Sequence, residues 1–440
     1  MIFIDIRDES GKVQAVILPK SPALDTAGTI REESVVEVVG KVNERPENNK
    51  QIEVQNGDIE IEITAINILN QAKVTPFPID GDTREVNESV RLEHRYLDLR
   101  SERMQKNVRN RFKTQHFIRN HLADKNFIEI ETPLLSSPTP EGSRSFVVPH
   151  RIWQGSYYSL PQSPQQYKQL LMVAGFEKYF QFARCMRDED TRGDRQPEFT
   201  QLDMELSFVD QKSVMETTED LLINLIRTNY PEKHIQEVPF PRLSYTEAMN
   251  KYGSDRPDIR KDKKDPDLLA FLWVVDFPMF EKTVEDNVDE VSEWTYSHNP
   301  FSKPKEEHLK DFMNGVNIGG ILSTQYDIVL NGFEIGGGSI RNHNPDALKK
   351  TFEIMGYSEK RIQDNFGHII KALSFGTPPH GGIAWGFDRL MMVLENEPNI
   401  REVIPFAKTG DGKDLLMSAP APISDKQKRE LNITNPNKES

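Results

Sequence analysis

Apolar and polar side chains alternate along residues 1–72, which is the period of a β-strand. In the first segment Ile2, Ile4 and Ile6 point to one side, and charged or aromatic residues point to the other. Gly11 then marks a turn before a return strand. Short strands with turn signals and almost no helical period predict a small β-barrel such as an OB-fold. The further predicted strands span residues 12–18, 34–42, 51–55 and 58–69.

The pattern changes after a polar stretch with prolines, which is predicted to be a hinge. A helix follows it, because Val108, Phe112, Ile118 and Leu122 recur at helical spacing. Strands and helices then alternate without an internal repeat or a parallel βαβ rhythm, which predicts an α+β fold. The predicted divisions are the barrel at 1–72, the hinge at 73–100, a second domain at 101–425 and a tail at 426–440.

Composition favours an ordinary globular protein of the cytoplasm. Hydrophobic residues make up 36% of the chain, and no apolar run reaches the ~20 residues that span a bilayer. The N-terminal residues contain no signal-peptide core. The single cysteine, Cys185, excludes an internal disulfide framework and a cysteine-rich zinc site.

Charge gives mixed indications about a nucleic-acid partner. The net charge of −14 favours a metabolic enzyme, because phosphate binding depends on Lys and Arg. Basic residues outnumber acidic ones between Arg91 and Lys113, although a solvated helix face explains this as well. Phe3 lies on the charged side of its strand, where it is either a cross-strand aromatic contact or a stacking surface for an unpaired base.

The strongest candidate site is the segment 185–208, in which charged residues of both signs crowd between Arg187 and Arg195. Polar residues such as Gln201 and Asp203 then alternate with apolar ones. This predicts a strand–loop–strand hairpin that places a charged loop beside a polar row. A binding site explains these charges better than a surface salt-bridge cluster, because unpaired buried charges are costly.

A second candidate segment places Asp327 and Glu334 on two strands joined by a turn at 331–332. Two converging carboxylates suit a hard divalent cation such as Mg²⁺, which binds alongside phosphates. Three glycines at 336–338 allow a ligand to approach the backbone, and Arg341 ends the strand. A plain glycine bulge is the alternative.

The third candidate segment is a small-residue strand that leads into an apolar helix at 380–394. Arg389 lies at this junction, close to Gly386. Helix N-terminal amides already attract phosphate there, so Arg389 is predicted to bind an anion.

Together these segments resemble a class II aminoacyl-tRNA synthetase of the bacterial aspartyl type. Its three class-defining motifs match at 127–135, 182–206 and 381–390. Aspartyl-type signatures such as LPQSPQQYKQLL (160–171) and GFEIGGGSIR (332–341) stand between them. The resemblance covers essentially the whole chain and implies an OB-fold followed by a catalytic domain on an antiparallel sheet flanked by helices.

The resemblance implies that ATP activates L-aspartate to aspartyl-adenylate, which is then transferred to tRNA-Asp, with tRNA-Asn as a second candidate acceptor. It implies a homodimer, through the motif at 127–135 and Pro133. It assigns catalysis to Arg187 and Arg389 and Mg²⁺ binding to Asp327 and Glu334. The implied aspartate ligands are Glu141, Gln165, Lys168, Asp203, His298 and Arg341. The implied ATP ligands are Arg187, Asp188, Glu189, Gln196, Phe199, Glu334, Gly386, Phe387, Asp388 and Arg389. The implied anticodon contacts are Phe3, Gln14 and Glu60.

Three departures from the family accompany this resemblance. The chain begins at the second strand of the family's barrel, so its first strand is expected to be missing. The large bacterial insertion is expected to be absent, because the segments 253–260 and 268–281 follow each other almost directly. Asn299 stands where the family usually has a second histidine before Pro300, which puts a role of Asn299 in amino-acid selection in doubt.

Two rival functions fit parts of the pattern. A tRNA-independent aspartate-activating enzyme, such as an asparagine synthetase-like ligase, would use the same catalytic domain but no barrel. An RNA-binding protein without catalysis would have damage at Arg187, Glu334 or Arg389, and all three residues are present.

Overall fold

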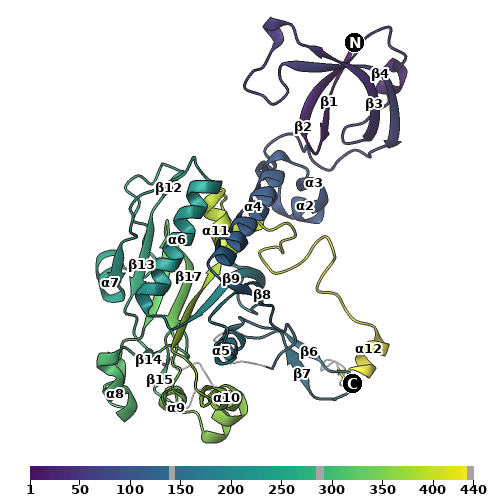
Figure 1. Ribbon diagram of the computed structural model, residues 1–440. Helices are drawn as coiled ribbons and strands as arrows, with labels where there is room; N and C mark the ends of the chain where they lie inside the picture. The colour runs from purple at the N-terminus through teal and green to yellow at the C-terminus, as the bar shows by residue number, and fades with distance from the viewer. Residues whose placement is uncertain (138–143, 284–291, 434–440) are drawn as a thin grey trace. The chain divides into compact units, whose positions relative to one another are not determined.

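The computed structural model describes residues 1–137, 144–283 and 292–433. The chain divides into two compact units, Met1–Val90 and Arg91–Ser440. This division falls inside the predicted hinge. Each unit is described by itself, and Figure 1 gives the labels of the elements.

The first unit is a small sheet of the predicted alternating strands. Its order is β1-β2-β4-β3, with β2 and β4 parallel and the other pairs antiparallel. Ala15, Ile17 and Ile63 form its core, onto which a short helix packs. Its elements are β1 (Ile2–Asp8), β2 (Gly11–Ile17), α1 (Leu24–Ala27), β3 (Val35–Glu44), η1 (Glu47–Asn49) and β4 (Ile59–Asn70).

The prediction of a strand at 51–55 is wrong. This segment forms a local turn, in which the Gln51 amide donates to the Gly57 carbonyl at 2.9 Å. Its two apolar residues have no core to face, because Ile52 is 89% exposed and Val54 is 55% exposed. Two alternating apolar positions are too short a pattern to distinguish a strand from a turn.

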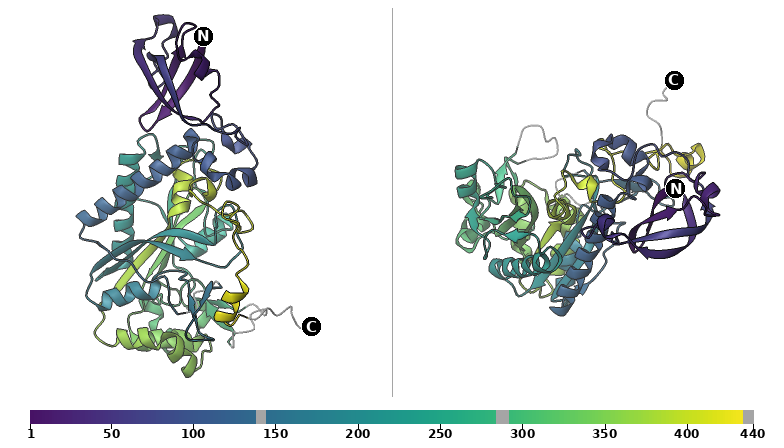
Figure 2. Two further views of the ribbon diagram at one scale, coloured as in Figure 1. Left: turned by 90° about the vertical axis from the view of Figure 1, so that its right-hand side faces the viewer. Right: turned by 90° about the horizontal axis from the view of Figure 1, so that it is seen from above.

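An eight-stranded sheet forms the centre of the second unit, and Figure 2 shows it crossing the unit between helices. Its order is β11-β13-β16-β17-β18-β9-β8-β5, and only the two edge pairs are parallel. The predicted antiparallel sheet is therefore confirmed. Its strands are β5 (Ile128–Glu129), β8 (Lys178–Met186), β9 (Glu198–Ser207), β11 (Arg242–Ser244), β13 (Phe271–Val275), β16 (Gln325–Leu330), β17 (Phe333–Ile340) and β18 (His380–Gly386).

Helices α4 (Glu102–Asp124), α6 (Gln211–Asn229) and α11 (Phe387–Leu394) cover the sheet and pack into its core. Ile118 and Leu122 of α4 are fully buried as predicted, but Phe112 is 66% exposed. Helical spacing therefore identified the helix but not the full width of its buried face. Among the described residues, no helix is both long and apolar enough to cross a membrane.

A second apolar cluster joins α8 (Leu309–Asn314), α9 (Pro345–Ile354) and α10 (Glu359–Leu373), with Phe352 and Phe366 stacked 3.8 Å apart. The remaining elements are η2 (Thr83–Glu85), α2 (Glu88–Glu93), α3 (Arg95–Asp98), β6 (Val147–Pro149), β7 (Tyr157–Ser159), α5 (Gln165–Val173), β10 (His234–Ile235), α7 (Tyr245–Tyr252), β12 (Leu268–Leu269), β14 (Phe280–Lys282), β15 (Trp294–Tyr296), η3 (Glu306–His308), η4 (Ile318–Gly320), η5 (Ile400–Glu402) and α12 (Asp425–Glu430).

The predicted turn between β16 and β17 is present at Asn331 and Gly332. Both residues have positive φ angles, 51° and 88°, which a two-residue hairpin turn of the primed type requires. The turn pairs Leu330 with Phe333, and a register shift between Ile328 and Val329 then places Asp327 opposite Gly337. This hairpin therefore places the residues of the second candidate segment, Asp327 and Glu334, on neighbouring strands.

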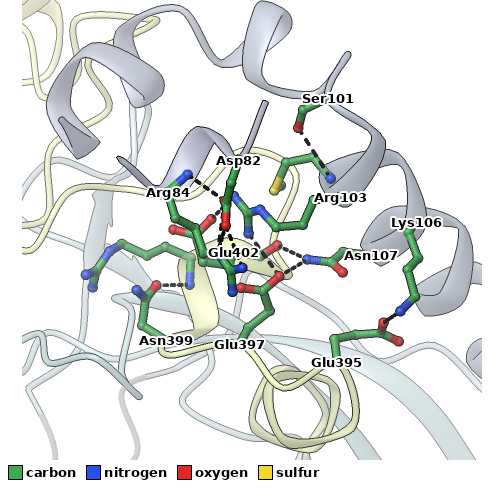
Figure 3. Close-up of polar contacts among 12 residues, drawn as sticks. Asp82, Arg84, Ser101, Arg103, Lys106, Asn107, Glu395, Glu397, Asn399 and Glu402 are labelled. Carbon is green, nitrogen blue, oxygen red and sulfur yellow. Dashed lines mark hydrogen bonds and ion pairs between the residues drawn. The ribbon is translucent and has the colours of Figure 1, made fainter. Parts of the chain in front are cut away.

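A buried network of charges joins the start of α4 to the loop after α11, as Figure 3 shows. The Arg103 guanidinium contacts Glu397 and Glu402, each at 2.9 Å. Glu402 also accepts two hydrogen bonds of 2.9 Å from Arg91. Burial opposes the ionisation of Glu402, but Arg91 and Arg103 outweigh it and hold its pKa at about 2. The network thus ties together chain segments that are about 300 residues apart.

Glu402→Gln is expected to lower the free energy of unfolding at pH 7 by about 3 kcal/mol. The folded-state pKa of Glu402 lies below the usual 4.5, so its stabilisation is present above pH 4.5 and is lost as the pH falls towards 2. Urea unfolding should therefore show a difference between wild type and variant that shrinks over this range. The exposed Glu306→Gln, which pairs with Lys303, should change stability by less than about 0.5 kcal/mol.

Candidate active site

The three candidate segments meet at one cavity of about 260 Å³. Strands β9, β17 and β18 supply its floor, and the start of α5 and of α11 supply further side chains. The cavity is therefore assembled from segments that are far apart in the sequence. The predicted residues that line it are Gln165, Lys168, Arg187, Glu189, Gln196, Phe199, Asp203, His298, Asp327, Glu334, Arg341, Gly386, Asp388 and Arg389.

Two described residues that were predicted to be in the site, Asp188 and Phe387, are not part of this lining. The backbone of Asp188 pairs with that of Arg144, and its side chain is half exposed. Phe387 is fully buried in the core and contacts Phe182 edge-on, so it positions the helix instead of facing the cavity. Glu141 lies outside the described residues.

Two buried cations and two buried carboxylates alternate at one end of the cavity. The Lys168 Nζ lies 2.6 Å from Asp203 and 3.2 Å from Glu205. The Arg341 guanidinium donates to both oxygens of Glu205, at 2.8 and 3.1 Å. Sequence reasoning missed Glu205 as a site residue, although its place in the alternating polar row of β9 was the available signal.

The pKa values at this end follow from the pairing. Burial raises the pKa of Asp203, whereas Lys168 opposes this. Burial also opposes the ionisation of Glu205, but Arg341 and Lys168 outweigh it and hold its pKa at about 2. Glu205 is therefore the firmly ionised partner that keeps both cations in place.

Two arginines mark the other end of the cavity. The Arg187 guanidinium lies 5.1 Å from the centre of the Phe199 ring, and within the described ranges it has no ion pair with a carboxylate. Arg389 donates to the Glu334 carbonyl at 2.8 Å and contacts the Asp194 carboxylate at 3.2 Å. An aromatic ring and two arginines on one cavity suit a nucleotide, whose base stacks and whose phosphates need cations.

Asp388 has a structural contact besides its place on the lining. Its carboxylate accepts a hydrogen bond of 2.9 Å from the Thr200 amide and an ion pair of 2.6 Å from Arg111. These contacts bind α11 to β9 and α4, so Asp388 holds Arg389 in position next to it.

The two carboxylates predicted to hold Mg²⁺, Asp327 and Glu334, both line the cavity, and in the described part of the chain no group of three or more metal-ligating side chains surrounds them. Burial raises the pKa of Asp327 well above its usual range, and the charges of Glu334 and Asp255 add to this. A cation bound at this point would lower the pKa of Asp327 and favour its ionised form. Gly337 leaves room for the carboxylate, because a Cβ there would lie 2.6 Å from Asp327 Oδ1.

Gly337→Ala is expected to raise the Mg²⁺ concentration for half-maximal aspartate-dependent pyrophosphate exchange about tenfold. The added methyl group would push the Asp327 carboxylate out of position. Titration of exchange activity with MgCl₂ measures the effect. Gly81→Ala is the control, because a Cβ at Gly81 meets no atom within 4 Å. An unchanged Mg²⁺ requirement in Gly337→Ala would contradict the assignment.

His298 and Asn299 also line the cavity. Burial lowers the pKa of His298, although Glu334 opposes this, and its ring contacts Phe277 at 4.6 Å. The Asn299 side chain accepts a hydrogen bond of 2.9 Å from the Phe301 amide. Asn299 thereby shapes the turn at which His298 is placed.

The three residues predicted to contact an anticodon share one face of the first unit. Gln14 pairs with Asp5, which is two positions from Phe3 on the same side of β1. Glu60 precedes the pair of Ile61 with Ala15, so it lies beside Gln14. Phe3 is 58% exposed on this face.

Comparison with known proteins agrees with this geometry. The model of the class II tRNA synthetases (D, K and N) matches residues 87–410, and that of the OB-fold nucleic acid binding domain matches residues 1–69. The chain therefore belongs to the class II tRNA synthetases of the D, K and N group. The family and the two folds predicted from the sequence are confirmed.

Its relatives include aspartate–tRNA ligases. The aspartate–tRNA(Asp/Asn) ligase of Rubrobacter xylanophilus is 36% identical over 99% of this chain and 92% of the relative. The aspartate–tRNA(Asp) ligase of Deinococcus radiodurans is 37% identical over 98% of this chain and 93% of the relative. The first alignment spans 558 positions, whereas the chain has 440 residues, so this relative contains stretches that the chain lacks.

Solved structures show the same fold. The asparaginyl-tRNA synthetase from Pyrococcus horikoshii complexed with asparaginyl-adenylate has a TM-score of 0.72 and 20% identity, over 92% of this chain and 91% of that one. A putative aspartyl-tRNA synthetase from Leishmania major Friedlin has a TM-score of 0.70 and 19% identity, over 92% and 87%.

Proposed function

We propose that this enzyme is an aspartate–tRNA ligase that activates L-aspartate with ATP and transfers it to tRNA-Asp. The observation that carries the proposal is the pair of buried cations, Lys168 and Arg341, beside the buried carboxylate of Asp203 in the cavity. The cations fit the side-chain carboxylate of aspartate, and Asp203 fits its ammonium group. The neutral side-chain amide of asparagine would replace charge-assisted contacts to these cations by weaker ones, which disfavours it relative to aspartate.

The reaction requires no side-chain nucleophile. The α-carboxylate of aspartate attacks the α-phosphorus of ATP, so a carboxyl oxygen–phosphorus bond forms and pyrophosphate leaves. Arg187 holds the α-phosphate and the attacking carboxylate, and Arg389 holds the γ-phosphate. Phe199 stacks on the adenine, which Glu189 and Gln196 contact. Catalysis therefore consists of positioning and charge stabilisation.

Asp327 and Glu334 are the residues that would hold Mg²⁺. The bound ion would neutralise phosphate charge beside Arg389. Arg389 donates to the backbone carbonyl of Glu334 at 2.8 Å, so the phosphate-binding and cation-binding residues are mechanically linked.

The second step uses the terminal ribose hydroxyl of the tRNA, which attacks the mixed anhydride and releases AMP. The face of the first unit with Phe3, Gln14 and Glu60 would contact the anticodon, with Phe3 stacking on a base. This proposal retains the predicted division into an anticodon-binding domain at 1–72, a hinge, and a catalytic domain at 101–425. It also includes a homodimer joined through residues 127–135 and a place in the cytoplasm.

A tRNA-independent ligase similar to asparagine synthetase is not supported. The OB-fold match at residues 1–69 and the full-length relatives both point to a tRNA substrate. Aminoacylation of purified tRNA-Asp and tRNA-Asn with radioactive aspartate tests the proposal. We expect charging of tRNA-Asp. The measurement with tRNA-Asn determines whether the enzyme distinguishes the two tRNAs. Exchange activity without charging of either tRNA would overturn the proposed transfer step.

A further inference from the structure

A chain of buried hydrogen bonds connects the start of β18 to the amino-acid end of the cavity. His380 Nδ1 lies 2.9 Å from the Pro378 carbonyl, and His380 Nε2 lies 3.3 Å from Gln169 Nε2. Gln169 Oε1 accepts from Gln165 Nε2 at 3.2 Å. His380 and Gln169 are fully buried, and Gln165 is 6% exposed. Water therefore does not compete for these groups.

The backbone carbonyl determines the direction of every bond in this chain. A carbonyl oxygen can only accept, so His380 carries its proton on Nδ1. Burial lowers the pKa of His380 despite the opposing charge of Glu205, so the ring is neutral at pH 7 and its Nε2 accepts. Gln169 must then turn its NH₂ group to His380 and its oxygen to Gln165. Gln165 in turn donates its NH₂ group to Gln169.

These hydrogen bonds fix the orientation of the Gln165 side-chain amide at the cavity. With its NH₂ group committed to Gln169, the side chain offers its Oε1 to a ligand. Asp203 lines the same cavity, and its Oδ2 is buried without a hydrogen-bond partner among the described residues. Two acceptors in one place suit a ligand group that only donates, such as an ammonium.

We propose that Gln169 and His380 are positioning residues that make Gln165 present its oxygen, and not its NH₂ group, to the ammonium of the bound amino acid. This inference rests on the proposed function, because it assumes that aspartate occupies the cavity. Neither residue touches the substrate, and both act through Gln165.

Gln169→Met tests the proposal, because methionine fills the same volume but cannot accept from Gln165 or donate to His380. Aspartate-dependent pyrophosphate exchange should show a KM for aspartate raised about tenfold, with the KM for ATP unchanged. Succinate has both carboxylates of aspartate but no amino group. Its inhibition constant should stay unchanged, whereas a general distortion of the site would weaken both ligands.

A double-mutant cycle separates action through Gln165 from a local packing effect. Gln165→Met should raise the KM for aspartate at least as much, and adding Gln169→Met to it should have no further effect. Gln166→Met is the matched control, because Gln166 is on the same helix with 6% exposure but contacts His368 instead. It should leave the ratio of aspartate to succinate affinity unchanged.

His380→Asn provides a second variant if Gln169→Met fails to fold. Asparagine can still donate to the Pro378 carbonyl but has no atom in the place of Nε2. A lower ratio of aspartate affinity to succinate affinity in either variant supports the proposal. An unchanged ratio in both overturns it, provided that the wild-type protein performs aspartate-dependent exchange. A wild-type protein without that exchange overturns the proposed function instead.

Discussion

Replacing Arg187 with alanine is expected to reduce aspartate-dependent pyrophosphate exchange about 1,000-fold without changing the fold. Arg187 lines the cavity next to Phe199 and, within the described part of the chain, forms no ion pair with a carboxylate, so its charge is available to a phosphate. Removing it would take away the group that stabilises charge in the transition state. Its loss leaves no buried carboxylate uncompensated, so stability should be unaffected.

Isotope exchange and circular dichroism together measure this effect. Arg184→Ala is the matched control, because Arg184 lies on β8, three residues before Arg187, but its side chain is 45% exposed and pairs with Glu198. It should keep its exchange activity within about twofold of the wild type. Substantial exchange in Arg187→Ala would show that another cation holds the α-phosphate.

Replacing Lys168 with leucine is expected to raise the KM for aspartate at least about 100-fold. Unlike Arg187, Lys168 is buried and pairs with Asp203 and Glu205, so its removal should also lower the free energy of unfolding by about 3–5 kcal/mol. Exchange kinetics and urea unfolding measure the two effects separately.

The double variant Lys168→Leu with Asp203→Asn separates stability from substrate binding. Neutralising Asp203 removes one uncompensated buried carboxylate, so much of the stability should return. Aspartate binding should not return. In the double variant, the residue proposed to bind the side-chain carboxylate and the residue proposed to bind the ammonium group are both replaced. A normal KM for aspartate in Lys168→Leu would mean that the side-chain carboxylate is bound elsewhere.

The sequence predicted those parts of the fold that depend on neighbouring residues. The hairpin of β8 and β9, the turn at Asn331 and the junction of β18 with α11 are all local patterns, and each is present. Short apolar patterns gave wrong predictions. Ile52 lies in a turn instead of a strand, and Phe112 is exposed although it follows the apolar spacing of its helix. Local sequence patterns do not predict which distant residues a side chain will contact in the folded protein.

Most of the predicted site residues line the cavity, but the sequence did not predict which of them contact one another. Gln165, Lys168 and Arg341 were named from motif resemblance, and they line the cavity. The pairing of Arg341 with Glu205 and the bond of Gln169 to His380 depend on which distant strands become neighbours. Phe387 shows the converse, because its place in a motif did not reveal that it packs into the core.

The pairing of β9 with β18 has a consequence for synthesis on the ribosome. Strand β9 ends at Ser207, but its neighbour β18 begins at His380, so the middle of the sheet stays open until the late strand has been translated. Glu402, which neutralises Arg91 and Arg103, emerges later still. The nascent chain therefore has a long interval in which an unpaired strand edge and several arginines are accessible, and chaperone capture at this stage would protect the polypeptide from aggregation.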